Sequence, residues 1–120
     1  ASDVYKRQVP NIIGRPDEAR VTAAATDIQA IGNALELYRL DNGHYPSTEQ
    51  GIEALVNQPT GYPAPRRWNP DGYLKKVPVD PWGEPYRFVS EGRAIDVYSY
   101  GADQREGGEG VDADIALSKL

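Results

Sequence analysis

The stretch PDEARVTAAATDIQAIGNALELYRL, residues 16–40, decides the fold. Apolar side chains recur along it in steps of three and four residues, at Val21, Ala24, Ile28, Ile31, Leu35 and Tyr38. This spacing places them on one face of a helix, while the opposite face is largely polar. Proline and two acids at 16–18 are typical of a first helical turn, and Asp-Asn-Gly at 41–43 is suited to a helix end. The stretch therefore predicts one long amphipathic helix over about residues 17–40.

Two further features follow this helix. Ser47 and Gln50 have the spacing of a capping box, and with the apolar residues after them they predict a second helix over 48–56. Six prolines lie between Pro59 and Pro81, which excludes a continuous helix or a central strand and favours a stiff, ordered loop. We expect three apolar side chains to pin this loop to the body of the domain: Trp68, Tyr73 and Leu74.

The second half of the chain has the pattern of a β-hairpin. Asp-Pro-Trp-Gly at 80–83 has proline and glycine where a type I turn favours them. Residues 86–89 and 95–100 alternate well enough to be strands, joined at 91–92. A long helix with one apolar face needs a sheet to cover that face. The 120 residues therefore predict one α+β domain, in which the long N-terminal helix packs on a small antiparallel sheet.

The net charge of −5 is concentrated in one segment. Residues 91–114 hold seven acids against two arginines, whereas the rest of the chain holds equal numbers of acids and bases. A chain of this sign repels phosphates, so we do not expect nucleic acid as a partner. No apolar run approaches the ~20 residues that span a bilayer. The chain has no cysteine, which excludes disulfides and thiolate chemistry.

Within the acidic segment, residues 100–115 combine four glycines with five acids. Glycines allow backbone carbonyls to turn inward, and carboxylates supply the hard oxygens that a calcium ion needs. The positions after Asp103 do not follow the spacing of an EF-hand. A solvated acidic loop is the alternative interpretation. However, the segment follows a strand, ends in apolar Ile115, and holds acids that repel one another unless a cation compensates, so we favour a calcium-binding loop.

Little in the sequence indicates catalysis. His44 is the only histidine, which removes the usual triads and multi-histidine metal sites, and we expect it to be a partly exposed packing or capping residue. Asp112 and Asp114 could serve glycoside hydrolysis, and Trp68 and Trp82 could stack on a sugar. A glycine-rich loop offers no pocket that raises a carboxyl pKa, and the tryptophans serve equally well as core anchors. A secreted carbohydrate-binding or hydrolytic domain is thus the weaker alternative.

Several blocks of the sequence, in the same order and at compatible spacing, resemble the major pseudopilins of the bacterial type II secretion system, the general secretion pathway protein G family. The match spans about residues 9–115, nearly the whole chain, and the blocks lie at residues 9–10, 15–17, 37–42, 45–51, 72–76, 78–83 and 101–103. The resemblance implies a type IV pilin-like fold. It also implies a non-enzymatic subunit of the pseudopilus, the periplasmic filament that helps push folded exoproteins through the outer-membrane secretin.

The resemblance also carries expectations about location and partners. Family members begin with a leader and an apolar helix that anchors the subunit in the inner membrane before assembly and forms the filament core afterwards. Neither is recognisable here, so we expect residues 9–120 to be a periplasmic head that is monomeric alone and meets the membrane only through that missing helix. Residues 1–8 look unrelated to the pattern and are expected to be an added or artefactual segment. The expected partners of the full-length protein are copies of itself, minor pseudopilins and the inner-membrane platform of the secretion system.

An adhesive type IV pilin head is an alternative of similar fold. Such pilins commonly close a C-terminal loop with a disulfide, and the absence of cysteine weighs against this class.

The calcium site of the family falls on the acidic loop. The resemblance implies six ligands, the first three through side chains and the others through backbone carbonyls: Asp103, Asp112, Asp114, Tyr100, Arg105 and Val111. Two departures stand out. Gln104 occupies a position where relatives often have glycine, and Ala-Leu-Ser at 116–118 replaces a Gly-Asn-Trp ending. The altered tail leaves open how the far end of the loop is held.

Overall fold

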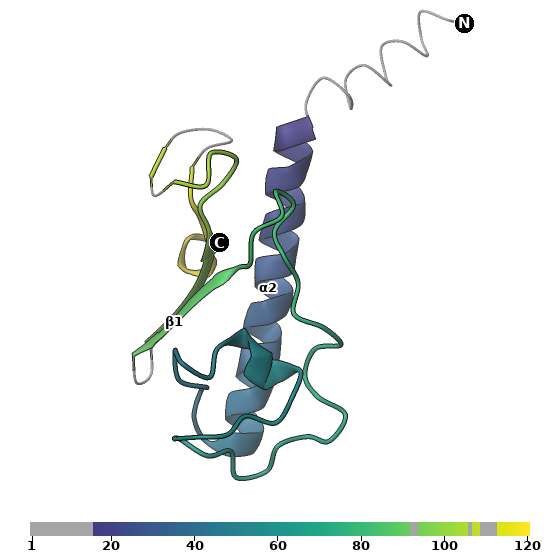
Figure 1. Cartoon of the computed structure of the whole chain (residues 1–120), viewed down its shortest axis with the longest axis vertical. Coiled ribbons are helices and arrows are strands. Elements are labelled where there is room, and N and C mark those ends of the chain that lie inside the picture. Colours follow the sequence, from purple (N-terminus) through teal and green to yellow (C-terminus); the bar gives the residue numbers. More distant parts are fainter. Residues whose placement is uncertain (1–15, 92–93, 106, 109–112) are drawn as a thin grey trace, which may run out of the picture.

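The computed structural model describes residues 16–91, 94–105, 107–108 and 113–120, so the segment 1–8 lies outside it. Its dominant element is the helix α2, Pro16–Asn42, which runs along the length of the domain (Figure 1). The predicted apolar stripe is confirmed, because five of its six residues are buried and Val21 packs against the core: Ala24, Ile28, Ile31, Leu35 and Tyr38. The helix ends at Asn42, and Gly43 follows it with a positive φ of 82°, which suits glycine. The Gly43 amide donates to the Arg39 carbonyl at 2.7 Å.

A three-stranded antiparallel sheet covers the apolar face of α2. Its strands are β1, Arg87–Glu91, β2, Ala94–Ser99, and β3, Ile115–Ala116, in the order β1-β2-β3. Phe88 lies opposite Val97 in the ladder, and both are buried with Ile115 against the helix. The hairpin is confirmed with its strand limits shifted by one or two residues. The third strand was not predicted, since two residues are too short to show an alternating pattern.

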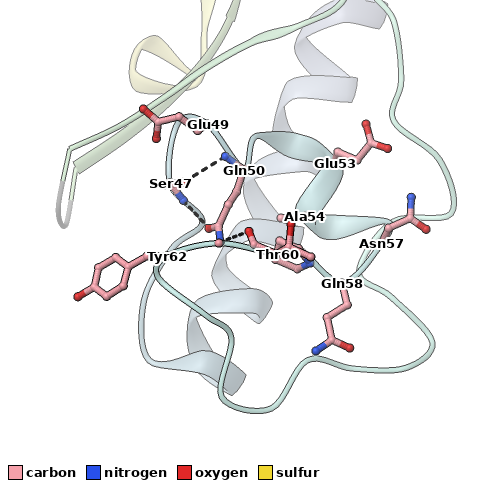
Figure 2. Close-up of a pocket in the computed structure, with 11 residues that line it drawn as sticks. Ser47, Glu49, Gln50, Glu53, Ala54, Asn57, Gln58, Thr60 and Tyr62 are labelled. Atoms are coloured by element: carbon pink, nitrogen blue, oxygen red, sulfur yellow. Dashed lines mark hydrogen bonds between the residues drawn. The ribbon is translucent and has the colours of Figure 1, made fainter.

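The second helix predicted over 48–56 is wrong. Ser47 and Gln50 do form both bonds of the capping box, since the Ser47 amide donates to Gln50 Oε1 at 2.9 Å and the Gln50 amide donates to Ser47 Oγ at 3.1 Å (Figure 2). The chain then passes through Gly51 at a φ of 69°, which an α-helix does not accommodate. Only a short 3₁₀ helix, η1, Ile52–Leu55, follows the cap.

The proline-rich loop is held to the body as expected. The Trp68 indole donates to the Ala54 carbonyl at 2.8 Å, and the backbone amides of Tyr73 and Leu74 donate to the Leu55 carbonyl at 2.7 and 3.0 Å. His44 is half-buried, and its ring nitrogens contact the carbonyls of Tyr45 and Ala64, which confirms a packing role. Of the helices in the described part of the chain, none combines the length and apolarity that a membrane span requires.

Candidate metal centre

The acidic loop leaves β2 after Ser99 and returns into β3 at Ile115, and these two residues are paired in the sheet. Both ends of the loop are therefore tethered at one end of the sheet (Figure 1). Four of the six predicted ligands belong to the described residues: Tyr100, Asp103, Arg105 and Asp114. The other two, Val111 and Asp112, lie outside them.

The first limb of the loop, residues 101–105, is a tight turn. The Gln104 amide donates to the Gly101 carbonyl at 3.2 Å, and the Arg105 amide donates to Asp103 Oδ1 at 3.0 Å. Gln104 has a φ of 56°, in the left-handed region that favours glycine. A glycine, which the family resemblance implies at this position, would suit such a backbone. Asp103 and Arg105 are both exposed at the tip of this turn.

Asp114, near the far end of the loop, is bonded to Gly107, which lies just beyond the first limb. The Gly107 amide donates to both carboxylate oxygens of Asp114, at 3.0 and 3.1 Å. Asp114 and Tyr100 also line one hollow of about 200 Å³, together with Asp96, Tyr98, Ala116 and Lys119. Two of the predicted ligand residues, one from each end of the loop, thus line the same hollow.

The ring of Tyr100 is engaged on the outer face of the sheet. The Arg87 guanidinium lies 4.4 Å from its centroid, and the ring of Tyr98 packs beside it at 5.5 Å. A side chain held in this way fits the predicted role of Tyr100, in which the backbone carbonyl and not the phenol faces the loop.

The donors in the described part of the loop are oxygens, which is the donor chemistry that calcium prefers. Two carboxylates and two carbonyls do not fill the six to eight positions of a calcium shell. Within the residues that the structure describes, no three His, Cys, Asp or Glu side chains gather as a metal site. The described donors suit calcium by their chemistry but do not complete its shell by themselves.

The tail after the loop is held by contacts that the sequence did not reveal. Ile115 and Ala116 pair with β2, and the following 3₁₀ helix η3, Leu117–Lys119, returns to the body. The amide and the hydroxyl of Ser118 donate to the Asp96 carboxylate at 3.1 and 2.9 Å. Leu117 lies so close to Gly32 on α2 that a Cβ there would meet it at 2.9 Å. The far end of the loop is therefore pinned despite its unusual sequence.

Asp80 is a residue of this region that the sequence did not indicate, beyond its place in the predicted turn. The turn is confirmed, because the Gly83 amide donates to the Asp80 carbonyl at 2.9 Å. Asp80 is also buried, with 2% of its surface exposed, and its carboxylate accepts hydrogen bonds from Ser99 and Gln104 at the base of the acidic loop. An Asp in a turn signals bonds to its own backbone. Contacts to partners 19 and 24 residues away give no local signal.

A long helix packed on a small antiparallel sheet, with an irregular loop closing the sheet's end, defines a type IV pilin-like subunit. Comparison with known proteins identifies the family within this class. It belongs to the family of type II secretion system protein G, whose model matches residues 11–118. The family resemblance seen in the sequence blocks is thereby confirmed, and the chain is a structural subunit of the pseudopilus.

Relatives and a solved structure agree on this assignment. The type II secretion system core protein G of Pseudomonas aeruginosa is 59% identical over 109 residues, which cover 89% of this chain and 77% of that protein. The protein of the same name from Vibrio cholerae is 51% identical, over 89% of this chain and 74% of its own length. The crystal structure of the major pseudopilin from the type 2 secretion system of enterohaemorrhagic Escherichia coli superposes with a TM-score of 0.78 at 41% identity, covering 92% of each chain.

Proposed function

We propose that this chain is the periplasmic head of a subunit that assembles with copies of itself into the pseudopilus and has no catalytic role. The full-length protein is held in the inner membrane before assembly, and it meets the minor pseudopilins and the membrane platform of the secretion system. The filament helps to drive folded exoproteins through the outer-membrane secretin. Membership of a structural pseudopilin family supports this proposal.

The observation that carries self-assembly is the outer face of α2, opposite the core. Six positions on it recur in steps of three and four, carry no charge and are all exposed: Ala23, Thr26, Ala30, Asn33, Leu37 and Leu40. Leu37 is 54% exposed and Leu40 is 82% exposed. Charged residues make up 26% of the chain, so an uncharged helix stripe with two exposed leucines stands out from the rest of the surface. Contact with another subunit would remove these leucines from water.

The test uses the full-length protein. We expect Leu37→Ser with Leu40→Ser to reduce filament assembly, measured by electron microscopy and sedimentation, while circular dichroism of the head is unchanged. Val89→Ser is the matched control, because Val89 is an exposed apolar residue on the sheet and not on the outer face of α2. Normal assembly of the double variant would show that this face is not the contact. Failure of the unaltered protein to form filaments would contradict self-assembly itself.

We further propose that a calcium ion braces the acidic loop. Asp103, Asp112 and Asp114 supply side-chain oxygens, and the carbonyls of Tyr100, Arg105 and Val111 supply the others. The support is the local charge of residues 91–114 together with the tethering of both loop ends to the sheet. The ion offsets the repulsion among the acids. Calorimetric titration with calcium tests the site, since Asp112→Ala and Asp114→Ala should each abolish binding.

The alternative of a carbohydrate-binding or hydrolytic domain has no supporting observation. Trp68 and Trp82 are partly buried and pack against the core instead of forming an open platform. The adhesive pilin alternative is set aside because the family match is to the secretion system.

A further inference from the structure

We propose that Asp80 is a positioning residue for calcium, a buried carboxylate that holds the first limb of the acidic loop in its ion-binding shape. This inference rests on the proposed calcium site. Asp80 is not itself a ligand in this proposal. It lies in the turn before β1 and acts on the loop through Ser99 and Gln104.

The carboxylate of Asp80 divides its bonds between two segments of the chain. Oδ1 accepts from the backbone amides of Trp82 at 3.1 Å and Glu84 at 2.8 Å, which closes its own turn. Oδ2 accepts from the Ser99 hydroxyl at 2.8 Å and from Gln104 Nε2 at 3.2 Å, which reaches the loop. All four donors are neutral. A buried carboxylate is stable only when hydrogen bonds replace its lost hydration, so these four donors hold it in one orientation.

Ser99 and Gln104 pass this constraint to the loop. Ser99 Oγ donates to Asp80 and accepts from the Gly101 amide at 3.2 Å. Gln104 Nε2 donates both to Asp80 and to the Gly101 carbonyl, the latter at 2.6 Å. Both polar groups of the Gly101 backbone are thereby linked to Asp80 Oδ2, the amide through the Ser99 side chain and the carbonyl through the Gln104 side chain. We call these four residues, Asp80, Ser99, Gly101 and Gln104, the Asp80 network.

The Asp80 network fixes residues 99–104, and three of the six proposed ligands lie within or next to this segment. Asp103 lies inside the turn that the network closes, and Tyr100 and Arg105 flank it. Gln104 is held at a positive φ that a non-glycine residue rarely adopts, and its side-chain bonds offset that strain. Glycine at this position would accept the φ but could not reach Asp80. The amide side chain therefore provides this chain with a link between the loop and the turn.

A limb shaped in advance binds an ion more tightly, because less chain ordering opposes binding. Loss of an outer-shell partner typically weakens metal binding by about 10-fold to 100-fold. We expect calcium binding to weaken by a factor in that range in Asp80→Asn, Gln104→Ala and Ser99→Ala. In Asp80→Asn the new amide NH₂ group faces other hydrogen-bond donors and cannot accept from them.

The experiment is calorimetric titration of the 120-residue chain with calcium chloride, alongside amide hydrogen exchange at Gly101 and Gln104 without calcium. Val97→Ala is the matched control, because Val97 is buried in the same strand as Ser99 and belongs to no part of the network. It should lower the melting temperature and leave the calcium Kd within about twofold. The three network variants should raise the Kd and speed exchange at Gly101 and Gln104.

The possible outcomes separate the two proposals. If the unaltered chain binds calcium and the network variants bind it equally well, the positioning role of Asp80 is overturned while the calcium site stands. A Val97→Ala variant that weakens binding as much as Asp80→Asn also overturns it, since general destabilisation would then explain the effect. Absence of calcium binding by the unaltered chain overturns both. Should Asp80→Asn fail to fold, Gln104→Ala and Ser99→Ala decide the matter.

Discussion

The phenol of Tyr86 donates a hydrogen bond of 2.8 Å to the carboxylate of Asp27, joining the segment before β1 to the middle of α2. The bond connects residues 59 positions apart in the chain. Tyr86 is buried, and Asp27 is half-buried beside it. The sheet is therefore fixed on the helix by a directed polar contact as well as by its apolar face.

Replacing Tyr86 by phenylalanine tests this contact. The ring still fills its place in the core, but Asp27 loses its partner, and hydrogen bonds to charged groups contribute about 1.5–3 kcal/mol. We expect Tyr86→Phe to lower the free energy of unfolding by about that amount, measured by urea denaturation. Tyr62→Phe is the control, because the Tyr62 side chain is 89% exposed. A difference below ~0.5 kcal/mol between the two variants would show that the bond contributes nothing measurable.

The hydroxyl of Tyr38 presents the opposite case. This hydroxyl is buried in the core, and it has no hydrogen-bond partner among the described residues. An unpaired buried hydroxyl is unfavourable by about 1–3 kcal/mol. We expect Tyr38→Phe to leave stability unchanged or to raise it by about 1 kcal/mol in the same urea assay. A loss of stability larger than ~1 kcal/mol would mean that the hydroxyl has a partner, such as a buried water.

These two tyrosines also predict sensitivity to alkaline pH. Burial raises the pKa of the Tyr38 phenol to about 12. Burial, reinforced by the bond to Asp27, also raises the pKa of Tyr86. In the unfolded chain a phenol loses its proton near pH 10, whereas the folded chain retains it. The stabilising contribution is thus complete below about pH 10 and is lost as the pH rises toward the folded pKa.

Urea denaturation between pH 8 and 12 measures this loss. We expect the free energy of unfolding to fall progressively above about pH 10. The fall should be shallower in Tyr38→Phe and in Tyr86→Phe, since each removes one phenol whose pKa differs between the two states. An equal slope in both variants and in the unaltered chain would contradict the assignment.

The sequence predicted those features whose signals are local. The stripe from Val21 to Tyr38 repeats over the whole helix, so its buried face could be named in advance. The helix expected after Ser47 did not form, because one glycine at a positive φ outweighs a well-formed capping box. The strand at Ile115 gains its structure only from its pairing with Ser99, and two residues contain no periodicity of their own.

In the candidate site, too, local features could be predicted from the sequence and long-range contacts could not. Composition alone pointed to the acidic loop, since charge and glycine content are counted within one segment, and the family resemblance then indicated Asp103 and Asp114 within it. The bond between Gly107 and Asp114 and the reach of Asp80 into the loop depend on folding. No pattern near Asp80 distinguishes a buried carboxylate from an ordinary turn residue, because its loop partners come from distant positions.

The strain at Gln104 can be separated from its hydrogen bonds by two substitutions. Gln104→Ala removes the side-chain bonds and keeps a residue that disfavours the φ of 56°, whereas Gln104→Gly removes the bonds and relieves the strain. Left-handed backbone disfavours a non-glycine residue by about 1–2 kcal/mol. We expect the glycine variant to unfold at higher urea concentration than the alanine variant, by about 1 kcal/mol. Equal stability of the two would mean that the turn relaxes away from the left-handed conformation.

Removal of calcium should destabilise the head. Binding of an ion at 100 times its Kd stabilises the folded state by about 2.7 kcal/mol, provided that the unfolded chain does not bind it. We therefore expect a chelator to lower the melting temperature of the unaltered chain, and we expect no further effect of the chelator on Asp114→Ala. Glu49→Gln is the control, because Glu49 is an exposed acid in the turn before η1. This substitution removes one negative charge, as Asp114→Ala does, but leaves the acidic loop unaltered. Its melting temperature should respond to the chelator as the unaltered chain does. If Asp114→Ala keeps the full response, the ion is bound without Asp114 and the ligand assignment is wrong.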